Sequence, residues 1–67
     1  MDIGKAIQII RKEKQISQKI LYQNFCSRRQ ISRIENNQCM PSLEMTIHIC
    51  KKLNVSIDYL VNLADSL

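Results

Sequence analysis

The sequence predicts an all-α fold, a compact bundle of five short helices within 67 residues. Apolar residues recur at intervals of three and four, which is the period of a helix face, and no stretch alternates with the period of a strand. A serine or an aspartate stands before each apolar segment, where its side chain can cap the first helical turn. Because 45% of the residues are hydrophobic, the chain can form one small core, and we expect a single domain over residues 1–67.

Five potential N-caps divide the chain, namely Asp2, Ser17, Ser27, Ser42 and Ser56. The helices are expected over about residues 3–14, 18–24, 28–36, 43–53 and from 57 onward. Residues 36–41, with two asparagines and a proline, are expected to form a loop, and Asn54 stands where a left-handed residue would end a helix. The side chains expected to face the core are Ile3, Ile7, Ile10, Leu21, Phe25, Ile31, Ile34, Leu43, Thr46, Ile49, Cys50, Leu53, Ile57, Leu60 and Val61.

The segment 17–36 has the most informative spacing. Two short helices are joined by about three residues, 25–27, which matches the spacing of a helix-turn-helix. A turn this tight requires the first helix and Phe25 to pack against Ile31 and Ile34 of the second. The outer face of the second helix then stays free.

That outer face is rich in arginine, and its residues are Arg28, Arg29, Ser32 and Arg33. On a helical wheel with a step of ~100° per residue, these four lie within ~140° of one another. Ile31 and Ile34 lie on nearly the opposite side. A guanidinium group donates two hydrogen bonds to guanine O6 and N7, or pairs with a phosphate, so this face is suited to a nucleic acid.

The charge distribution agrees with a polyanionic partner. Residues 1–35 carry eight basic and three acidic side chains, whereas residues 36–67 carry two basic and three acidic ones. The net charge is therefore +5 in the first half and −1 in the second. A basic surface confined to one part of a domain favours binding to nucleic acid.

Cysteine and histidine positions predict neither a metal site nor a disulfide. Cys26, Cys39 and Cys50 form no C-x-x-C pair, and His48 has no liganding neighbour at zinc spacing. An odd number of cysteines without a signal peptide indicates reduced thiols in the cytoplasm. We expect no cofactor, no metal and no membrane partner. An enzyme is not expected either, because the small core leaves few residues to line a cleft and no nucleophile–base pair is evident.

Short motifs follow one another in a fixed order along almost the whole chain. They are Ile3-Gly4, Ile10-Arg11-Lys12, Ile16-Ser17-Gln18, Leu21, Ile31-Ser32-Arg33-Ile34-Glu35-Asn36, Pro41-Ser42 and Leu53-Asn54-Val55-Ser56-Ile57-Asp58-Tyr59-Leu60. In this order, residues 3–63 resemble the lambda-repressor-like helix-turn-helix family, also called the XRE or Cro type.

Two features depart from the commonest family pattern. Cys26 stands where many members carry glycine, and the segment before Ile31 is one residue shorter. Both features are similar to the Rgg and PlcR type of peptide-sensing transcriptional regulators.

The resemblance implies roles for individual residues. The positions that match base-reading ones are Arg28, Arg29, Arg33, Gln30 and Ser32. The positions that match DNA phosphate contacts are Gln18, Ser27, Asn36 and Asn37. Arg11 and Glu35 match a structural ion pair between the first and third helices.

The function that the resemblance implies is sequence-specific binding of double-stranded DNA for transcriptional regulation, by a homodimer on a two-fold-related operator. Two versions stay open: the DNA-binding domain of a longer peptide-pheromone-responsive regulator, whose dimer forms through a region absent from this chain, or a complete small phage-type repressor. An antitoxin or other protein-interaction module on the same fold is an alternative. The arginines argue against it, because protein interfaces usually expose apolar anchors.

Four residues outside these sets have two interpretations each. Ile9 lies off the core stripe and is either a surface residue or a contact with another domain or subunit. Tyr22 either contacts phosphate or covers the core edge, and Cys39 is either passive or a redox-sensitive thiol. His48 is expected to be a structural side chain of the fourth helix rather than a regulatory one.

Overall fold

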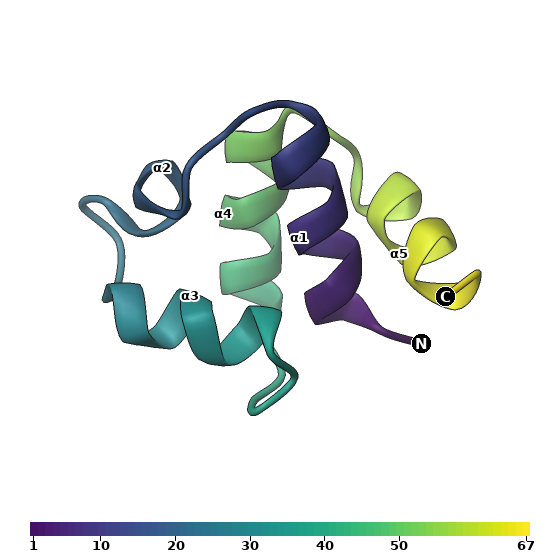
Figure 1. Ribbon diagram of the computed structural model, residues 1–67, viewed down its shortest axis with the longest axis horizontal. Coiled ribbons are helices and arrows are strands. Elements are labelled where there is room, and N and C mark those ends of the chain that lie inside the picture. Colours follow the sequence, from purple (N-terminus) through teal and green to yellow (C-terminus); the bar gives the residue numbers. More distant parts are fainter.

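The computed structural model describes all 67 residues and confirms the all-α architecture. Its elements are α1 (Ile3–Glu13), α2 (Gln18–Tyr22), α3 (Arg28–Glu35), α4 (Leu43–Leu53) and α5 (Ile57–Asp65). α1 and α4 stand side by side at the centre, with α2 and α3 on one side and α5 on the other (Figure 1). None of the five helices has the length and apolarity needed to cross a bilayer.

Side-chain caps begin four of the five helices. The capping oxygen accepts a hydrogen bond from the amide three residues later, at 2.9 Å for Asp2 to Lys5, 3.1 Å for Ser27 to Gln30, 3.1 Å for Ser42 to Met45 and 3.0 Å for Ser56 to Tyr59. Ser17 has the extended backbone of a cap, but its side chain makes no such bond. Asn54 ends α4 in the left-handed conformation, with φ 58°, as predicted.

One apolar cluster holds the helices together. Its buried members are Ile3, Ala6, Ile7, Ile10, Leu21, Ile31, Ile34, Met45, Ile49, Cys50, Leu53, Leu60 and Ala64. Every helix contributes at least one of them, so no helix is an appendage. Within α3, Ile31 and Ile34 are almost completely buried, and they anchor the inner side of the helix.

The prediction for the end of the second helix is wrong by two residues. α2 ends at Tyr22 and not at Asn24, because Gln23 leaves the helical conformation and Asn24 adopts a positive φ of 64°. The connection to α3 therefore takes residues 23–27 rather than three residues. The longer connection carries Phe25 away from the core.

The predicted packing of Phe25 against Ile31 and Ile34 is also wrong. The Phe25 side chain is 40% exposed, and its ring stacks on the imidazole of His48 in α4. Asn24 reverses the chain just before Phe25, so the phenyl ring turns toward α4 instead of lying beneath α3.

Two further core predictions fail at the first residue of a helix. Leu43 is 71% exposed and Ile57 is 38% exposed, whereas Met45 and Ala64 are buried in α4 and α5. Side chains on a helix lean toward its N-terminus, so those of Leu43 and Ile57 point past the ends of α4 and α5, where little covers them. Ile3, the first residue of α1, is buried instead, because α1 packs on α3, α4 and α5. Thr46 and Val61 are half-buried, at the edge of the core.

Gly4 lets α1 lie directly against the end of α3. A Cβ atom at this position would overlap the carbonyl oxygen of Ile34 and lie 2.8 Å from Oδ1 of Asn37. Such a contact is shorter than real Cβ atoms make, so a side chain here would push α1 and α3 apart. The glycine therefore helps to set the position of α3.

Candidate nucleic-acid interface

The outer face of α3 carries three exposed guanidinium groups, those of Arg28, Arg29 and Arg33, which we call the arginine ridge. Gln30 beside them is exposed and Ser32 is half-buried. The only ion pair in the structure involves none of these arginines, so all three charges face solvent without a protein partner. The inner face of the same helix is buried in the core, which keeps the ridge turned outward.

The arginine ridge borders two adjoining open hollows. The larger one, of about 600 Å³, has a purely polar lining made up of Arg28, Arg29, Ser32, Arg33 and Gln38. The smaller one, of about 370 Å³, is lined by Ser27, Arg29, Gln30, Arg33 and Cys39. Two of the arginines line both hollows, so all five residues predicted to read bases border one continuous surface, which is polar except at Cys39.

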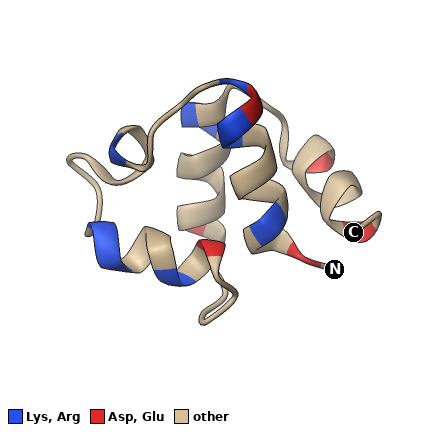
Figure 2. Ribbon diagram, viewed as in Figure 1, with Lys and Arg blue, Asp and Glu red and all other residues tan.

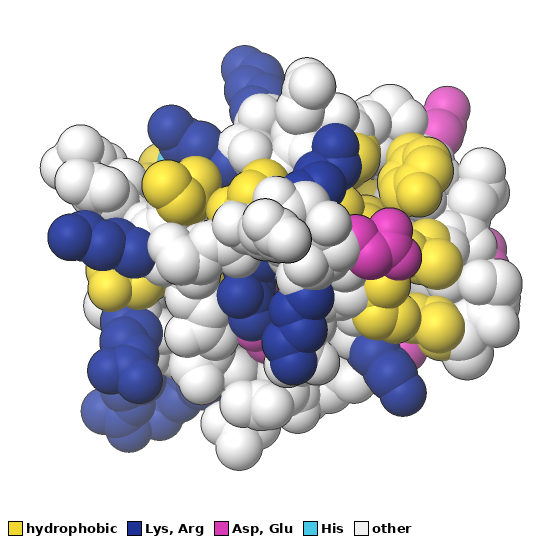
Figure 3. Space-filling model, turned by 45° about the horizontal axis from the view of Figure 1, so that its top comes forward, with side chains coloured by type: hydrophobic (Ala, Val, Ile, Leu, Met, Phe, Trp, Pro, Cys, Tyr) yellow, Lys and Arg dark blue, Asp and Glu magenta, His cyan; other side chains and the backbone are white.

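This surface is electropositive. Figure 2 shows basic residues at the start and in the middle of α3, and Figure 3 shows Lys and Arg side chains projecting at the edge of the molecule where α2 and α3 lie. Unpaired guanidinium groups on one helix face repel one another and attract a polyanion. The N-terminus of α3 adds its partial positive charge at the same place.

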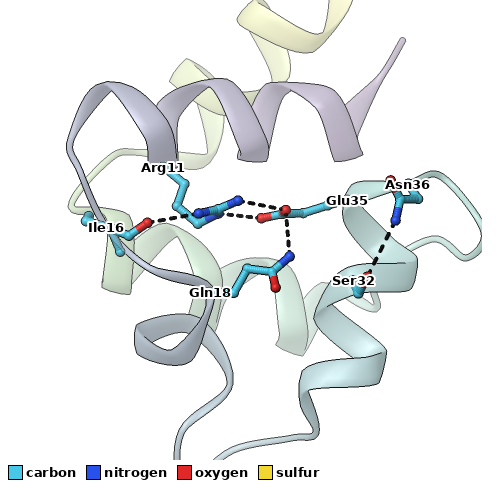
Figure 4. Close-up of polar contacts among 6 residues, drawn as sticks. All are labelled: Arg11, Ile16, Gln18, Ser32, Glu35 and Asn36. Carbon is cyan, nitrogen blue, oxygen red and sulfur yellow. Dashed lines mark hydrogen bonds and ion pairs between the residues drawn. The ribbon is translucent and has the colours of Figure 1, made fainter.

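A buried polar network fixes the back of α3. The guanidinium of Arg11 in α1 meets the carboxylate of Glu35, with Nε 2.7 Å from Oε2 and Nη2 3.1 Å from Oε1 (Figure 4). Gln18 of α2 donates from Nε2 to Oε1 of Glu35 at 3.0 Å, and Arg11 also donates to the carbonyl of Ile16 at 3.1 Å. Glu35 as a whole residue is only 5% exposed, and its carboxylate therefore ties α1, α2 and α3 together inside the protein.

Comparison with protein families identifies a matching family. A model described as a helix-turn-helix domain matches residues 4–66, which include all of α2 to α5 and all but the first residue of α1. The chain belongs to the helix-turn-helix domain family. Such domains bind DNA through the second helix of the motif, which is α3 here. A comparison with curated proteins finds no match to the chain.

In this helix-turn-helix domain, the residues predicted to contact phosphate lie in different settings. Gln18 is half-buried, and its amide is held by Glu35. Ser27 caps α3 and lines the smaller hollow. Asn36 is exposed just after α3, and its Nδ2 lies 3.5 Å from the hydroxyl oxygen of Ser32, at the outer limit of a hydrogen bond.

The Asn37 side chain is bound to Asp2, at the start of α1. Its Nδ2 donates to Oδ1 of Asp2 at 2.6 Å, and its own Oδ1 faces Gly4. This hydrogen bond, with a second one from the amide of Lys5, lowers the pKa of Asp2 below its ordinary value of 3.8. The Asn37 side chain therefore joins the α3–α4 loop to the start of α1.

Sequence reasoning missed three residues at or behind this surface. Gln38 and Cys39 line the two hollows, although the loop that holds them has no periodicity that would place their side chains. His48 was expected to be structural, but its specific contacts were not foreseen: its Nε2 lies 2.8 Å from the carbonyl oxygen of Leu21, and its ring stacks on Phe25. Tyr22 packs against the core cluster, which fits the interpretation that it covers the core edge.

The three cysteines occupy different environments in the helix-turn-helix domain. Cys39 is exposed, Cys26 is half-buried and Cys50 is buried, and none forms a disulfide. Burial raises the pKa of both Cys26 and Cys50, because a thiolate is poorly solvated there. No three His, Cys, Asp or Glu side chains come together as a metal site.

Proposed function

We propose that this helix-turn-helix domain binds double-stranded DNA in a sequence-specific manner and thereby regulates transcription. The observation that carries the proposal is the arginine ridge. Three unpaired guanidinium groups stand on the outer face of an eight-residue helix whose inner face is anchored in the core. A rigid helix that presents bidentate donors is suited to reading base edges in the major groove.

In the proposed complex, α3 lies in the major groove with the arginine ridge toward the bases. Arg28, Arg29 and Arg33 are assigned to guanine O6 and N7, because a guanidinium fork matches that pair of acceptors. Gln30 and Ser32 are assigned to neighbouring base edges, since both border the same hollows. The open hollows beside the arginines leave room for the edges of base pairs.

Contacts to the sugar-phosphate backbone would set the orientation of α3. Ser27 and the first amides of α3 form a helix N-terminus, which favours a phosphate. An amide nitrogen has two hydrogens, so Gln18 can donate one to Glu35 and the other to a phosphate. Asn36 is exposed just after α3 and is proposed to contact a phosphate. Asn37, the next residue of the same loop, is also exposed and is proposed for the same role.

The experiment is a binding titration with a labelled duplex enriched from a randomised pool. Arg29→Lys keeps the charge and removes the fork, whereas Arg29→Ala removes both. We expect each change to weaken binding to the selected duplex by about 1–3 kcal/mol and to relax the preference at one base pair. Binding should also weaken steeply as salt rises, since each phosphate contact releases counterions.

Lys14→Ala is the matched control. It removes one exposed positive charge at the end of α1, away from the two hollows, so base preference should not change. If the wild-type protein binds no duplex at low salt, or if arginine variants keep both affinity and preference, the proposal fails.

We further propose a homodimer on a two-fold-related operator, in a regulator of the peptide-responsive type. The spacing from Cys26 to Ile31 supports this class, and Cys26 packs half-buried against the core at the turn that carries the resemblance. Gel filtration at micromolar concentration distinguishes a complete small repressor from the DNA-binding domain of a longer regulator. A complete small repressor elutes as a dimer, whereas the DNA-binding domain of a longer regulator elutes as a monomer and needs artificial dimerisation for tight binding.

A further inference from the structure

We propose that His48 of α4 is a positioning residue for DNA recognition, which sets the start of α3 by holding the turn between α2 and α3. This inference rests on the proposed function, because it concerns how the arginine ridge is placed against DNA. His48 is half-buried and lies on a helix that contributes nothing to the hollows beside the ridge. Its influence is therefore indirect.

The first contact of His48 is with the end of α2. Its Nε2 lies 2.8 Å from the carbonyl oxygen of Leu21, and a carbonyl only accepts, so Nε2 carries the hydrogen. No backbone amide donates to this oxygen: α2 ends one residue later, the Gln23 amide bonds to the carbonyl of Lys19, and those of Phe25 and Cys26 bond to the carbonyl of Tyr22. His48 thus satisfies a helix-end carbonyl that would otherwise lack a protein donor.

The second contact of His48 is with the turn itself. The Phe25 ring stacks on the imidazole with the two centroids 3.8 Å apart and an interplanar angle of 9°. Asn24, with φ 64°, reverses the chain so that the phenyl ring faces α4. One imidazole therefore holds the end of α2 through its edge and the following turn through its face.

These contacts reach α3 because the turn leads straight into it. Ser27, two residues after Phe25, caps α3, and Arg28 and Arg29 form its first turn. α4 packs mainly on α1, α2 and α5, and both α1 and α2 pack on α3. His48 itself contacts α2 and the turn, so its own path to α3 runs through them. A shift of Phe25 would move the first turn of α3 and, with it, two guanidinium groups of the arginine ridge.

The test compares three substitutions of His48. His48→Ala removes both contacts, His48→Phe keeps a stacking ring without the donor, and His48→Gln keeps a donor without the ring. Affinity is measured for the selected duplex and for a scrambled duplex, at a temperature where circular dichroism shows each variant folded. We expect His48→Ala to lose about tenfold in affinity for the selected duplex and little for the scrambled one, with partial recovery in the other two.

Val61→Ala is the matched control, because it removes half-buried apolar atoms from α5, which packs on α1 and α4. It should lower the melting temperature without changing the ratio of the two affinities. If His48→Ala also lowers only the melting temperature and keeps the wild-type ratio, the inference is overturned. If His48→Ala does not fold, His48→Phe and His48→Gln test the inference through the same ratio of affinities for the selected and the scrambled duplex. If the wild-type protein itself binds neither duplex, the proposed function is contradicted instead.

A two-dimensional NMR spectrum of the backbone amides tests independently whether His48 positions the start of α3. In His48→Ala the cross-peaks of residues 26–29 should move, whereas those at the end of α3 should stay near their wild-type positions, since Ile31 and Ile34 still anchor it. Unchanged cross-peaks over residues 26–29 would contradict the inference even if affinity fell.

Discussion

Glu35 of α3 has its carboxylate buried against the guanidinium of Arg11 in α1, with Oε2 2.7 Å from Nε. The two side chains are 2% and 12% exposed, and both carboxylate oxygens are engaged. Because Gln18 of α2 bonds to the same carboxylate, this pair links the two helices of the motif to the rest of the fold. The orientation of the arginine ridge depends on that link.

Removing Arg11 should destabilise the protein strongly. Arg11→Ala leaves a buried carboxylate with no countercharge, and we expect a loss of about 3–5 kcal/mol in the free energy of unfolding. Glu35→Ala should cost less, because Arg11 is the more exposed partner and keeps its bond to the Ile16 carbonyl. Urea denaturation of the two single variants and the double variant measures this. A double variant whose loss equals the sum of the single losses would contradict the coupling.

Gly4→Ala should destabilise the protein, although alanine is usually the better helix former. The added methyl group overlaps the carbonyl of Ile34 and crowds Asn37, and both belong to the segment that holds the end of α3. We expect a cost of about 1–3 kcal/mol, measured by thermal or urea unfolding. Lys5→Ala, at the exposed position next to it, is the control and should change stability little. A more stable Gly4→Ala protein would show that α1 and α3 are not in close contact.

The hydrogen bonds to Asp2 predict a pH-dependent contribution to stability. The folded-state pKa of Asp2 is lowered from 3.8, chiefly by the bond from Asn37, so the carboxylate is favoured in the folded protein. Its contribution is complete above pH 3.8 and disappears as the pH falls through the lower folded-state pKa. Asp2→Asn still caps α1 but cannot ionise, so its unfolding free energy should fall less steeply below pH 3.8 than that of the wild type. Parallel curves for the two proteins would contradict this.

The three thiols should react at different rates with an aromatic disulfide reagent. Cys39 is exposed and should react first, whereas Cys26 and Cys50 are partly or fully buried and have raised pKa values that reduce the thiolate fraction. We expect one fast and two slow phases in the folded protein and uniform rates in urea. Cys39→Ser should abolish the fast phase alone. A fast phase that remains in this variant would mean that the core around Cys26 or Cys50 opens readily.

The failed core predictions for Phe25 and Leu43 concern residues at or near a helix end. Phe25 was expected under α3 because a three-residue turn would place it there, but Asn24 ends α2 early and redirects the ring. Leu43 was expected inside because it fits the apolar stripe, but it is the first residue of α4 and points past the core. Both side chains are apolar, as the periodic pattern requires. Whether each is buried depended on where its helix begins or ends.

The five helices, four of their five side-chain caps and the arginine ridge were determined by the sequence alone, because each depends on residues within one or two turns. The bond from the Gln30 amide to Ser27 spans three residues, and the opposition of Arg29 and Arg33 to Ile31 and Ile34 follows from the helical period. Only the tertiary structure decided which partners His48 and Asn37 have. The bond from Asn37 to Asp2 spans 35 residues and that from His48 to Leu21 spans 27, so both arise only when the helices pack. No local period encodes such distances, and the packing of the buried core sets them.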